Sequence, residues 1–211
     1  MKVLLITIFL ALPCFVFAQV KEDDYAIYSN YLKTLQKDTS GKITYVIRVS
    51  GDYEGKKGQS YISDIVSDLR DYLKGTKSYG LAFVKFRLFR DTIKKDTLWV
   101  PIMAQLSQEM KKRYYIKNSF SKDLQVDLLT YPLYAGFFEQ KDAQDVWPAF
   151  HEYYPGDSRL IELSQVVSDG KRAAFFFSEG CGGLCGGASL ILYYKDSSGW
   201  RFAGEFPLWY H

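Results

Sequence analysis

The chain has 211 residues, of which 24% are charged, 47% hydrophobic and 17% aromatic. The first two values are ordinary for a folded protein, and the low hydrophobicity with high net charge that marks disorder is absent. The formal net charge of +3 is too balanced for a nucleic-acid partner, which needs a clear basic patch. Because the chain has only two histidines, a histidine-rich metal site is excluded. We expect a folded protein without metal or other cofactor.

The first eighteen residues have the pattern of a secretory signal peptide. Lys2 precedes an apolar stretch from Val3 to Ala18, with Val16 and Ala18 at positions −3 and −1 of the expected cleavage site. A transmembrane anchor would need about 20 apolar residues, and this stretch is shorter and contains Pro13. Cys14 raises a lipoprotein alternative, but Pro13 stands where a small residue should precede a lipidated cysteine. We expect a periplasmic or secreted protein of residues 19–211, without a stable membrane span.

The mature chain has the pattern of a single α+β domain with a mainly antiparallel sheet and packed helices. Asp23-Asp24 opens a helix in which Tyr25, Tyr28, Leu32 and Leu35 recur at helical spacing. The other expected helices are a segment from Ser60 or Ser63 to Gly75, Gln105–Arg113 and Asp142–Tyr153. The expected strands are Ile43–Val49, Leu81–Phe89 and Leu124–Leu129, and Leu98–Met103 is a further short apolar run that Pro101 limits.

The last fifty-five residues, about 157–211, predict a four-stranded antiparallel meander. The strand-like runs are Leu160–Val167, Arg172–Ser178, Ser189–Tyr194 and Trp200–Phe206, joined by short turns such as Asp169-Gly170. In the final run Trp200, Phe202 and Phe206 share one parity, which is typical of a half-buried strand. We expect those three rings on one face.

Cys181 and Cys185 are the cysteines that remain after removal of the signal peptide. Five glycines and one leucine surround them at an expected hairpin tip: Gly180, Gly182, Gly183, Leu184, Gly186 and Gly187. An oxidising compartment favours a structural disulfide here. The alternatives are a redox-active pair, although such pairs are usually Cys-x-x-Cys at a helix N-terminus, and a zinc site with His151 and His211, which are sixty residues apart.

The C-terminal part, Asp142–His211, resembles the end of a family of uncharacterised secreted bacterial proteins. The matching residues are Tyr154-Pro155-Gly156, Leu163-Ser164-Gln165-Val166, Cys181-Gly182-Gly183-Leu184-Cys185-Gly186, Gly199-Trp200 and Leu208-Trp209, with Tyr25–Ser29 near the start. The distinctive element is the cysteine loop. The resemblance implies export and a single folding unit, and it implies no mechanism.

Two short motifs suggest enzymatic chemistry. Gly156-Asp157-Ser158 resembles the nucleophile motif of an esterase family, but a nucleophilic serine needs a base, and the only downstream histidine is His211. The simpler interpretation is a turn. The loop Gly51–Gly58 follows a strand, but its spacing does not fit a phosphate-binding loop, and Asp52 and Glu54 would repel phosphate.

These observations favour an exported, non-enzymatic protein that binds an unidentified protein partner or small ligand. The alternative is an exported enzyme, either a thiol–disulfide oxidoreductase acting through Cys181 and Cys185 or a hydrolase whose site the sequence does not locate.

We predict that the mature N-terminus is Gln19, because the small residues at positions −3 and −1 are what signal peptidase selects. Intact-mass measurement or N-terminal sequencing of the exported protein checks this. A lipid-modified chain that begins at Cys14 would contradict it.

Overall fold

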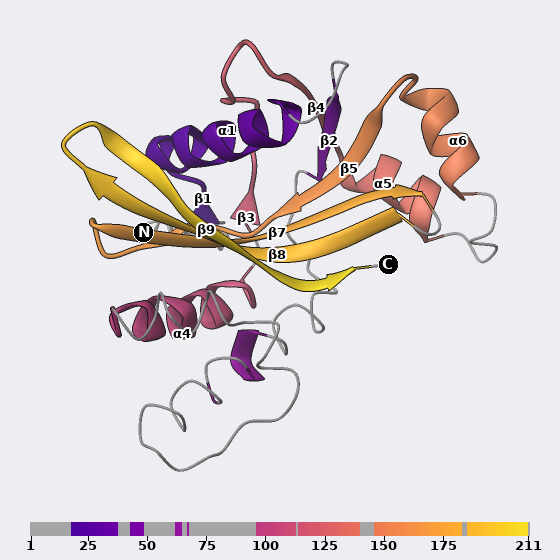
Figure 1. Ribbon diagram of the computed structural model, residues 1–211. Coiled ribbons are helices and arrows are strands. Elements are labelled where there is room, and N and C mark those ends of the chain that lie inside the picture. Colours follow the sequence, from indigo (N-terminus) through magenta and orange to yellow (C-terminus); the bar gives the residue numbers. More distant parts are fainter. Residues whose placement is uncertain are drawn as a thin grey trace, which may run out of the picture.

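A mixed β-sheet lies at the centre of the protein (Figure 1). The computed structural model describes residues 18–37, 43–48, 62–64, 67, 96–112, 114–139, 146–182 and 185–210. Within these residues the sheet has seven strands: β2 (Thr44–Arg48), β4 (Gln125–Leu129), β5 (Ser158–Leu163), β6 (Val167–Ser168), β7 (Arg172–Gly182), β8 (Cys185–Asp196) and β9 (Gly199–Tyr210). A short parallel pair, β1 (Ala18–Gln19) with β3 (Tyr114–Tyr115), forms a second sheet.

The strand order is β4-β2-β5-β7-β8-β9, and β6 pairs with β7 beyond the end of β5. β2 is parallel to both β4 and β5, whereas β5 and β6 pair with β7, β7 with β8 and β8 with β9 in antiparallel fashion. The predicted α+β class and the C-terminal antiparallel meander are therefore confirmed. The first predicted strand of the meander is divided into β5 and β6.

Helices cover both faces of this sheet. They are α1 (Glu22–Lys37), α4 (Trp99–Glu109), α5 (Tyr131–Phe138) and α6 (Val146–Tyr153). Figure 1 shows α1 on one side of the sheet, α4 on the other, and α5 and α6 together at one end. Alternate side chains of β7 enter two hydrophobic clusters on opposite faces of the sheet. Phe175 and Phe177 belong to the buried cluster under α1, which we call the α1 cluster. Ala174 and Phe176 belong to the buried cluster against α4, which we call the α4 cluster.

The face under α1 is an aromatic core. The predicted spacing along this helix is confirmed, since Tyr25, Tyr28 and Leu32 are buried and Leu35 packs partly buried against them. The Tyr28 ring meets Phe175 edge-on, with 5.2 Å between the ring centroids. This T-shaped geometry places the positive edge of one ring against the negative face of the other.

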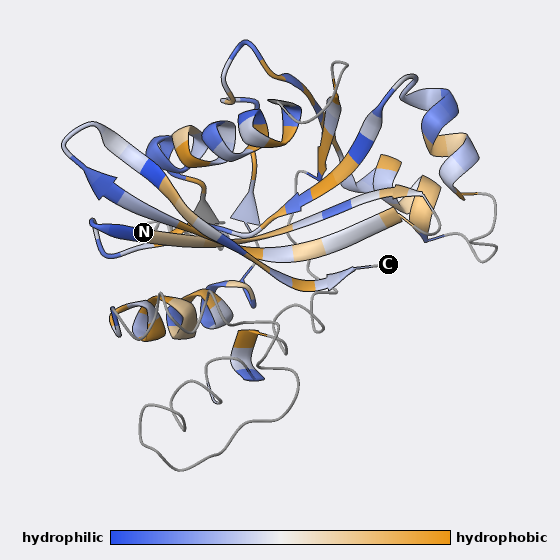
Figure 2. Cartoon of the chain, in the orientation of Figure 1, coloured by the Kyte–Doolittle hydropathy of each residue, from blue (hydrophilic) through white to orange (hydrophobic). Residues whose placement is uncertain are grey.

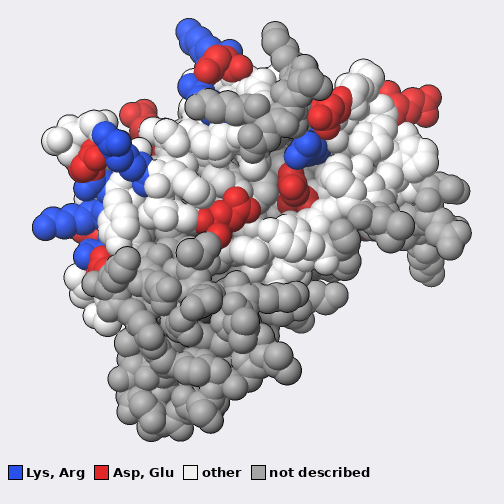
Figure 3. Space-filling view, in the orientation of Figure 1, with Lys and Arg blue, Asp and Glu red and all other residues white. Residues whose placement is uncertain are grey.

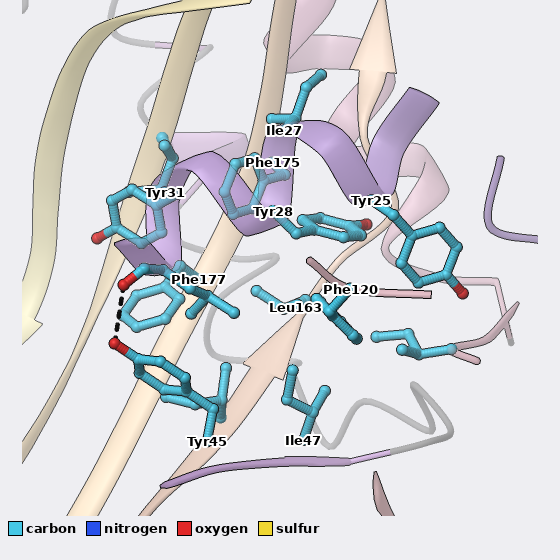
Figure 4. Packing of buried hydrophobic residues seen from close by; sticks show 14 of the residues in the cluster. Tyr25, Ile27, Tyr28, Tyr31, Tyr45, Ile47, Phe120, Leu163, Phe175 and Phe177 are labelled. Carbon is cyan, nitrogen blue, oxygen red and sulfur yellow. Dashed lines mark hydrogen bonds between the residues drawn. The ribbon is translucent and has the colours of Figure 1, made fainter. Parts of the chain in front are cut away.

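Two hydroxyl groups of this core donate to main-chain carbonyls. Tyr28 donates to the carbonyl oxygen of Ser164 at 2.6 Å, and Tyr45 donates to that of Leu32 at 2.8 Å (Figure 4). Burial raises the pKa of Tyr28 well above its ordinary value. These bonds join α1 to β2 and to the segment after β5, so the rings fix the position of the helix on the sheet as well as filling space.

The apolar run Leu98–Met103 belongs to α4 and is not a separate extended segment. Pro101 is the third residue of this helix, where the missing N–H would have no intrahelical partner in any case. Trp99, Ile102 and Met103 are buried against the sheet. The helix predicted to begin at Gln105 therefore begins six residues earlier, and it ends at Glu109.

Several predictions fall partly or wholly outside the described residues. They concern the signal peptide up to Phe17, the loop Gly51–Gly58, the strand Leu81–Phe89, the first part of the predicted helix Asp142–Tyr153 and His211. Of the helix predicted to end at Gly75, Ile62–Asp64 and Ser67 are described, all of them helical. Ile62 is buried against the α4 cluster.

The prediction that Trp200, Phe202 and Phe206 share one face is wrong for Phe206, whereas Trp200 and Phe202 both lie on the side of α1. β9 pairs with β8 through two register shifts, one of which lies between Tyr193↔Phe202 and Leu192↔Gly204. Such a bulge inserts an extra residue and reverses the faces of the side chains that follow it, up to the next register shift. Phe202 accordingly lies near Tyr31 of α1 and is 46% exposed, whereas Phe206 is buried in the α4 cluster on the opposite face.

We predict that Phe206→Ala costs about 3–5 kcal/mol of unfolding free energy, because it leaves a cavity in a packed core. Phe202→Ala should cost about 1–2 kcal/mol, since this ring buries only about half of its surface. Urea unfolding of both variants measures the difference. Equal losses, or a larger loss for Phe202→Ala, would contradict the register assigned to β9.

Candidate functional site: an aromatic surface beside the disulfide hairpin

The predicted disulfide is present at the end of the β7–β8 hairpin. It joins Cys181 and Cys185, whose Cα atoms are 5.3 Å apart. Cys185 is exposed and Cys181 is partly buried, while Gly183 and Leu184 of the predicted loop lie outside the described residues. Because both sulfur atoms are used in this bond, they are not thiolate ligands for a metal.

The glycines beside the disulfide allow aromatic rings and backbone to approach closely. A Cβ atom on Gly180 would lie 2.9 Å from the Trp147 ring of α6, and one on Gly187 would lie 2.8 Å from the Tyr210 ring of β9. A Cβ atom on Gly186 would lie 2.8 Å from the carbonyl oxygen of Glu179. Real Cβ contacts are not this short, so these glycines are required by packing.

His151 connects α6 to the hairpin. Its Nδ1 lies 3.2 Å from the hydroxyl oxygen of Ser158, and its Nε2 lies 3.1 Å from the carbonyl oxygen of Cys181. Ser158 donates its own proton to the carbonyl oxygen of Tyr154 at 2.6 Å. Both neighbours of the imidazole therefore accept hydrogen bonds, so neutral His151 can make one of these bonds at a time and the imidazolium can make both.

The Ser158–His151 contact is a pairing that the sequence analysis missed, because it considered only histidines downstream of the serine. The contact does not create an exposed nucleophile. Ser158 is 1% exposed, and its proton is already donated to the carbonyl group of Tyr154. Gly156, with a φ of 90°, makes the turn that leads into β5. The interpretation of this motif as a turn therefore accounts for its geometry.

Next to the hairpin, α5 and α6 present a surface of aromatic rings. We call it the α5–α6 surface and define it by Tyr131, Tyr134, Phe137, Phe138, Trp147 and Tyr153. None of the eight residues of α5 is buried, although Figure 2 shows strongly hydrophobic residues in this helix. Tyr131 is 49% and Tyr153 is 57% exposed. The inner side of α5 packs only partly buried against a small cluster that includes Phe150 and Tyr154. An apolar helix normally buries a complete stripe against its neighbours, so the partial burial of α5 is unusual.

The rings of this surface contact one another in a chain that ends at the hairpin. Phe137 meets Tyr153 with 5.7 Å between ring centroids, and Phe138 meets Trp147 at 5.5 Å. Trp147 stacks on His151 at 5.9 Å with an interplanar angle of 29°. Through His151, the aromatic contacts reach the main chain at Cys181.

A buried ion pair holds the inner side of α5. The Arg48 guanidinium at the end of β2 lies 3.8 Å from the centroid of the Tyr134 ring and 3.1 Å from a carboxylate oxygen of Glu162 on β5. Arg48 is only 7% exposed. The aromatic ring and the carboxylate both attract the cation, and together they offset the free energy that it loses when it is removed from water.

The charges around this surface are acidic. Among the described residues of segment 127–157, four are Asp or Glu and none is Lys or Arg, whereas the whole chain carries a net charge of +3. The described acidic residues of this segment are all exposed: Asp127, Glu139, Glu152 and Asp157. Burial raises the pKa of Tyr154, and Tyr153 and the negative charge of Asp127 raise it further.

Basic side chains gather elsewhere. In Figure 3, most of the Lys and Arg groups on the visible face lie at the end of the sheet that is far from α6. Arg159, at the start of β5, pairs with Glu179 at 3.2 Å and with Asp157 at 3.4 Å. Burial opposes its charge, but these carboxylates outweigh that effect and raise the pKa of Arg159. Its positive charge is thus locally compensated.

A second candidate is a groove of about 450 Å³ between α1 and the segment Ser119–Ser121. Its polar groups are largely used within the protein. The Ser29 hydroxyl accepts from the main-chain N–H of Ser121 at 2.9 Å, and the Tyr25 hydroxyl accepts from that of Lys117 at 2.7 Å. Lys33 at its rim pairs with Asp123 at 2.9 Å. The α5–α6 surface is therefore the stronger candidate.

Three further findings concern the class of protein. Among the described residues, no three His, Cys, Asp or Glu side chains gather in a way that would hold a metal ion. Within the same residues, no helix is both long enough and apolar enough to cross a membrane. Nothing among known family models, curated proteins or solved structures matches this chain at a significant level.

We predict that replacing both Cys181 and Cys185 by serine leaves the domain folded and lowers the melting temperature by a few degrees. The closed ring is short, so chain-entropy arithmetic gives only about 2 kcal/mol for the bond. Calorimetry with and without reductant measures the effect. The double variant has no disulfide to reduce, so reductant should leave its melting temperature unchanged, and this controls for other effects of the reductant. Global unfolding of the double variant would contradict a local, structural role.

Proposed function

We propose that this protein is exported and acts without catalysis, by binding a protein partner through the α5–α6 surface. In this proposal the disulfide hairpin is a structural support. The signal-peptide pattern of the first eighteen residues supports export. The observation that carries the binding role is the incomplete burial of an apolar helix, α5, in which no residue is fully buried and Tyr131 is exposed.

Exposed aromatic side chains gathered in one place favour a binding role on energetic grounds. A Phe ring left fully in water forgoes a transfer free energy of about 1.5–3 kcal/mol that burial would provide, and a partly buried ring forgoes part of it. Single exposed rings are normal, but clusters of this kind mark interaction sites. Tyr and Trp are also the residues most enriched at the centres of protein interfaces. Contacts between the rings hold them in place before a partner arrives, which reduces the entropic cost of binding.

Thiol–disulfide exchange is the second candidate function, because Cys185 is exposed at the end of a hairpin. It would require Cys181 and Cys185 to cycle between the dithiol and the disulfide. A reduction potential near that of oxidoreductases, with insulin-reduction activity that is lost in the double serine variant, would favour this function over the structural role. A serine hydrolase has less support, since Ser158 is buried.

We predict that a photo-crosslinking amino acid placed at Tyr153 captures a defined partner in producing cells, whereas the same group at Leu98 does not. Both positions are exposed, but Leu98 lies at the start of α4, away from α5 and α6. Gel shifts and mass spectrometry of the purified products identify the captured species. The same products at both positions, or none at Tyr153, would contradict the proposed function.

A further inference from the structure

We infer that the α5–α6 surface binds a basic peptide segment, one in which Lys or Arg side chains project toward the exposed tyrosines. This inference rests on the proposed function and adds the chemistry of the partner. It is carried by two observations: the local excess of negative charge and the pairing of an exposed ring with a carboxylate.

The charge around the surface is opposite in sign to that of the chain as a whole. The described part of segment 127–157 has four exposed carboxylates, Asp127, Glu139, Glu152 and Asp157, and no Lys or Arg, whereas the whole chain carries +3. A cationic segment would therefore be attracted to this part of the protein. Charge complementarity of this kind selects partners and speeds association more than it adds to affinity. Because most acidic groups here are exposed, their attraction weakens as salt is added.

The protein already contains one example of the contact that we propose. On the inner side of α5, the Arg48 guanidinium lies between the Tyr134 ring and the Glu162 carboxylate. On α5 itself, the exposed Tyr131 hydroxyl donates to the Glu139 carboxylate at 3.1 Å. A ring and a carboxylate thus occur together again, and both side chains are exposed.

On α6, Glu152 and Tyr153 are both exposed, which adds a further carboxylate and a further ring to this surface. A cation over an exposed ring contributes about 0.5–1 kcal/mol, and more when water is displaced. Several such contacts, together with the acidic residues around them, would select a segment with more than one Lys or Arg. Anionic lipid would be repelled by the same carboxylates.

The test uses the full chain and three fluorescent decapeptides, (Lys-Ala)5, (Ser-Ala)5 and (Glu-Ala)5, with binding followed by anisotropy. We expect the dissociation constant for (Lys-Ala)5 to be at least tenfold below those of the other two and to rise at least tenfold from 50 to 500 mM salt, a dependence expected of exposed charges. Glu139→Gln with Glu152→Gln should weaken its binding at least threefold and reduce the salt dependence. Tyr131→Ser with Tyr153→Ser should weaken it at least fivefold.

Matched controls are Glu22→Gln and Leu98→Ser, which remove an exposed carboxylate and an exposed apolar side chain elsewhere. Neither should change the affinity. Circular dichroism and the melting temperature of each variant show that it is folded, and the glutamine variants, which keep the shape of the side chain, remain informative if a serine variant is unstable.

Other outcomes would overturn the inference. Equal affinity for (Lys-Ala)5 and (Ser-Ala)5, or binding unaffected by the two glutamine substitutions, would contradict the inference that the partner is basic. The proposed function would then still be tested by the crosslinking experiment at Tyr153. Binding to vesicles of phosphatidylglycerol, or a dimer seen by light scattering, would reassign the surface if Tyr153→Ser abolished it. If no peptide binds and Tyr153 captures nothing, the inference and the proposed function fail together.

Discussion

The β7–β8 hairpin is the constraint on which the other parts of this protein depend. Its two strands are eleven and twelve residues long, and alternate side chains of β7 enter the cores on opposite faces of the sheet. α1 packs on Phe175 and Phe177, and α4 packs on Phe176. At the far end the same hairpin carries the disulfide and contacts α6. One long element therefore sets the positions of both helical layers and of the candidate site.

The hairpin positions the α5–α6 surface through close contacts that depend on small residues. Trp147 can lie against β7 because position 180 is glycine, and His151 contacts the main chain of Cys181 one residue later. From Trp147 the ring contacts continue to Phe138 of α5. The disulfide limits the movement of the main chain that His151 contacts. In this account it supports the binding surface without taking part in chemistry.

Much of the fold could be predicted from local patterns. The helical spacing from Tyr25 to Leu35, the short turns of the C-terminal meander and the glycine-flanked cysteines each depend on neighbouring residues, and the structure confirms all three. The faces of Phe202 and Phe206 could not be predicted in this way, because one bulge reverses the parity and bulges leave no reliable trace in the sequence. The start of α4 was missed because Pro101 was read as a limit, whereas the first turn of a helix tolerates proline.

The candidate site was harder to predict because its signals are spread over several elements. α5 was not predicted at all, although Pro132 lies in its first turn, where proline is favoured. The contact between His151 and Ser158 joins a helix to a strand, and only the fold brings them together. A local charge count could have pointed to this region. The net charge of the whole chain is +3, whereas residues 127–157 alone contain six Asp or Glu and one Lys, which is a net charge of −5.

The central claim is that a partner covers the α5–α6 surface where the protein works. Hydroxyl-radical footprinting followed by mass spectrometry tests this directly, by comparing the exported fraction of producing cells with the purified protein. Phe202, which is also partly exposed, serves as the internal reference. The account predicts that Tyr131 and Tyr153 are oxidised several-fold less in the exported fraction than in the purified protein, while oxidation of Phe202 is unchanged. Equal oxidation of both tyrosines in the two samples would contradict it.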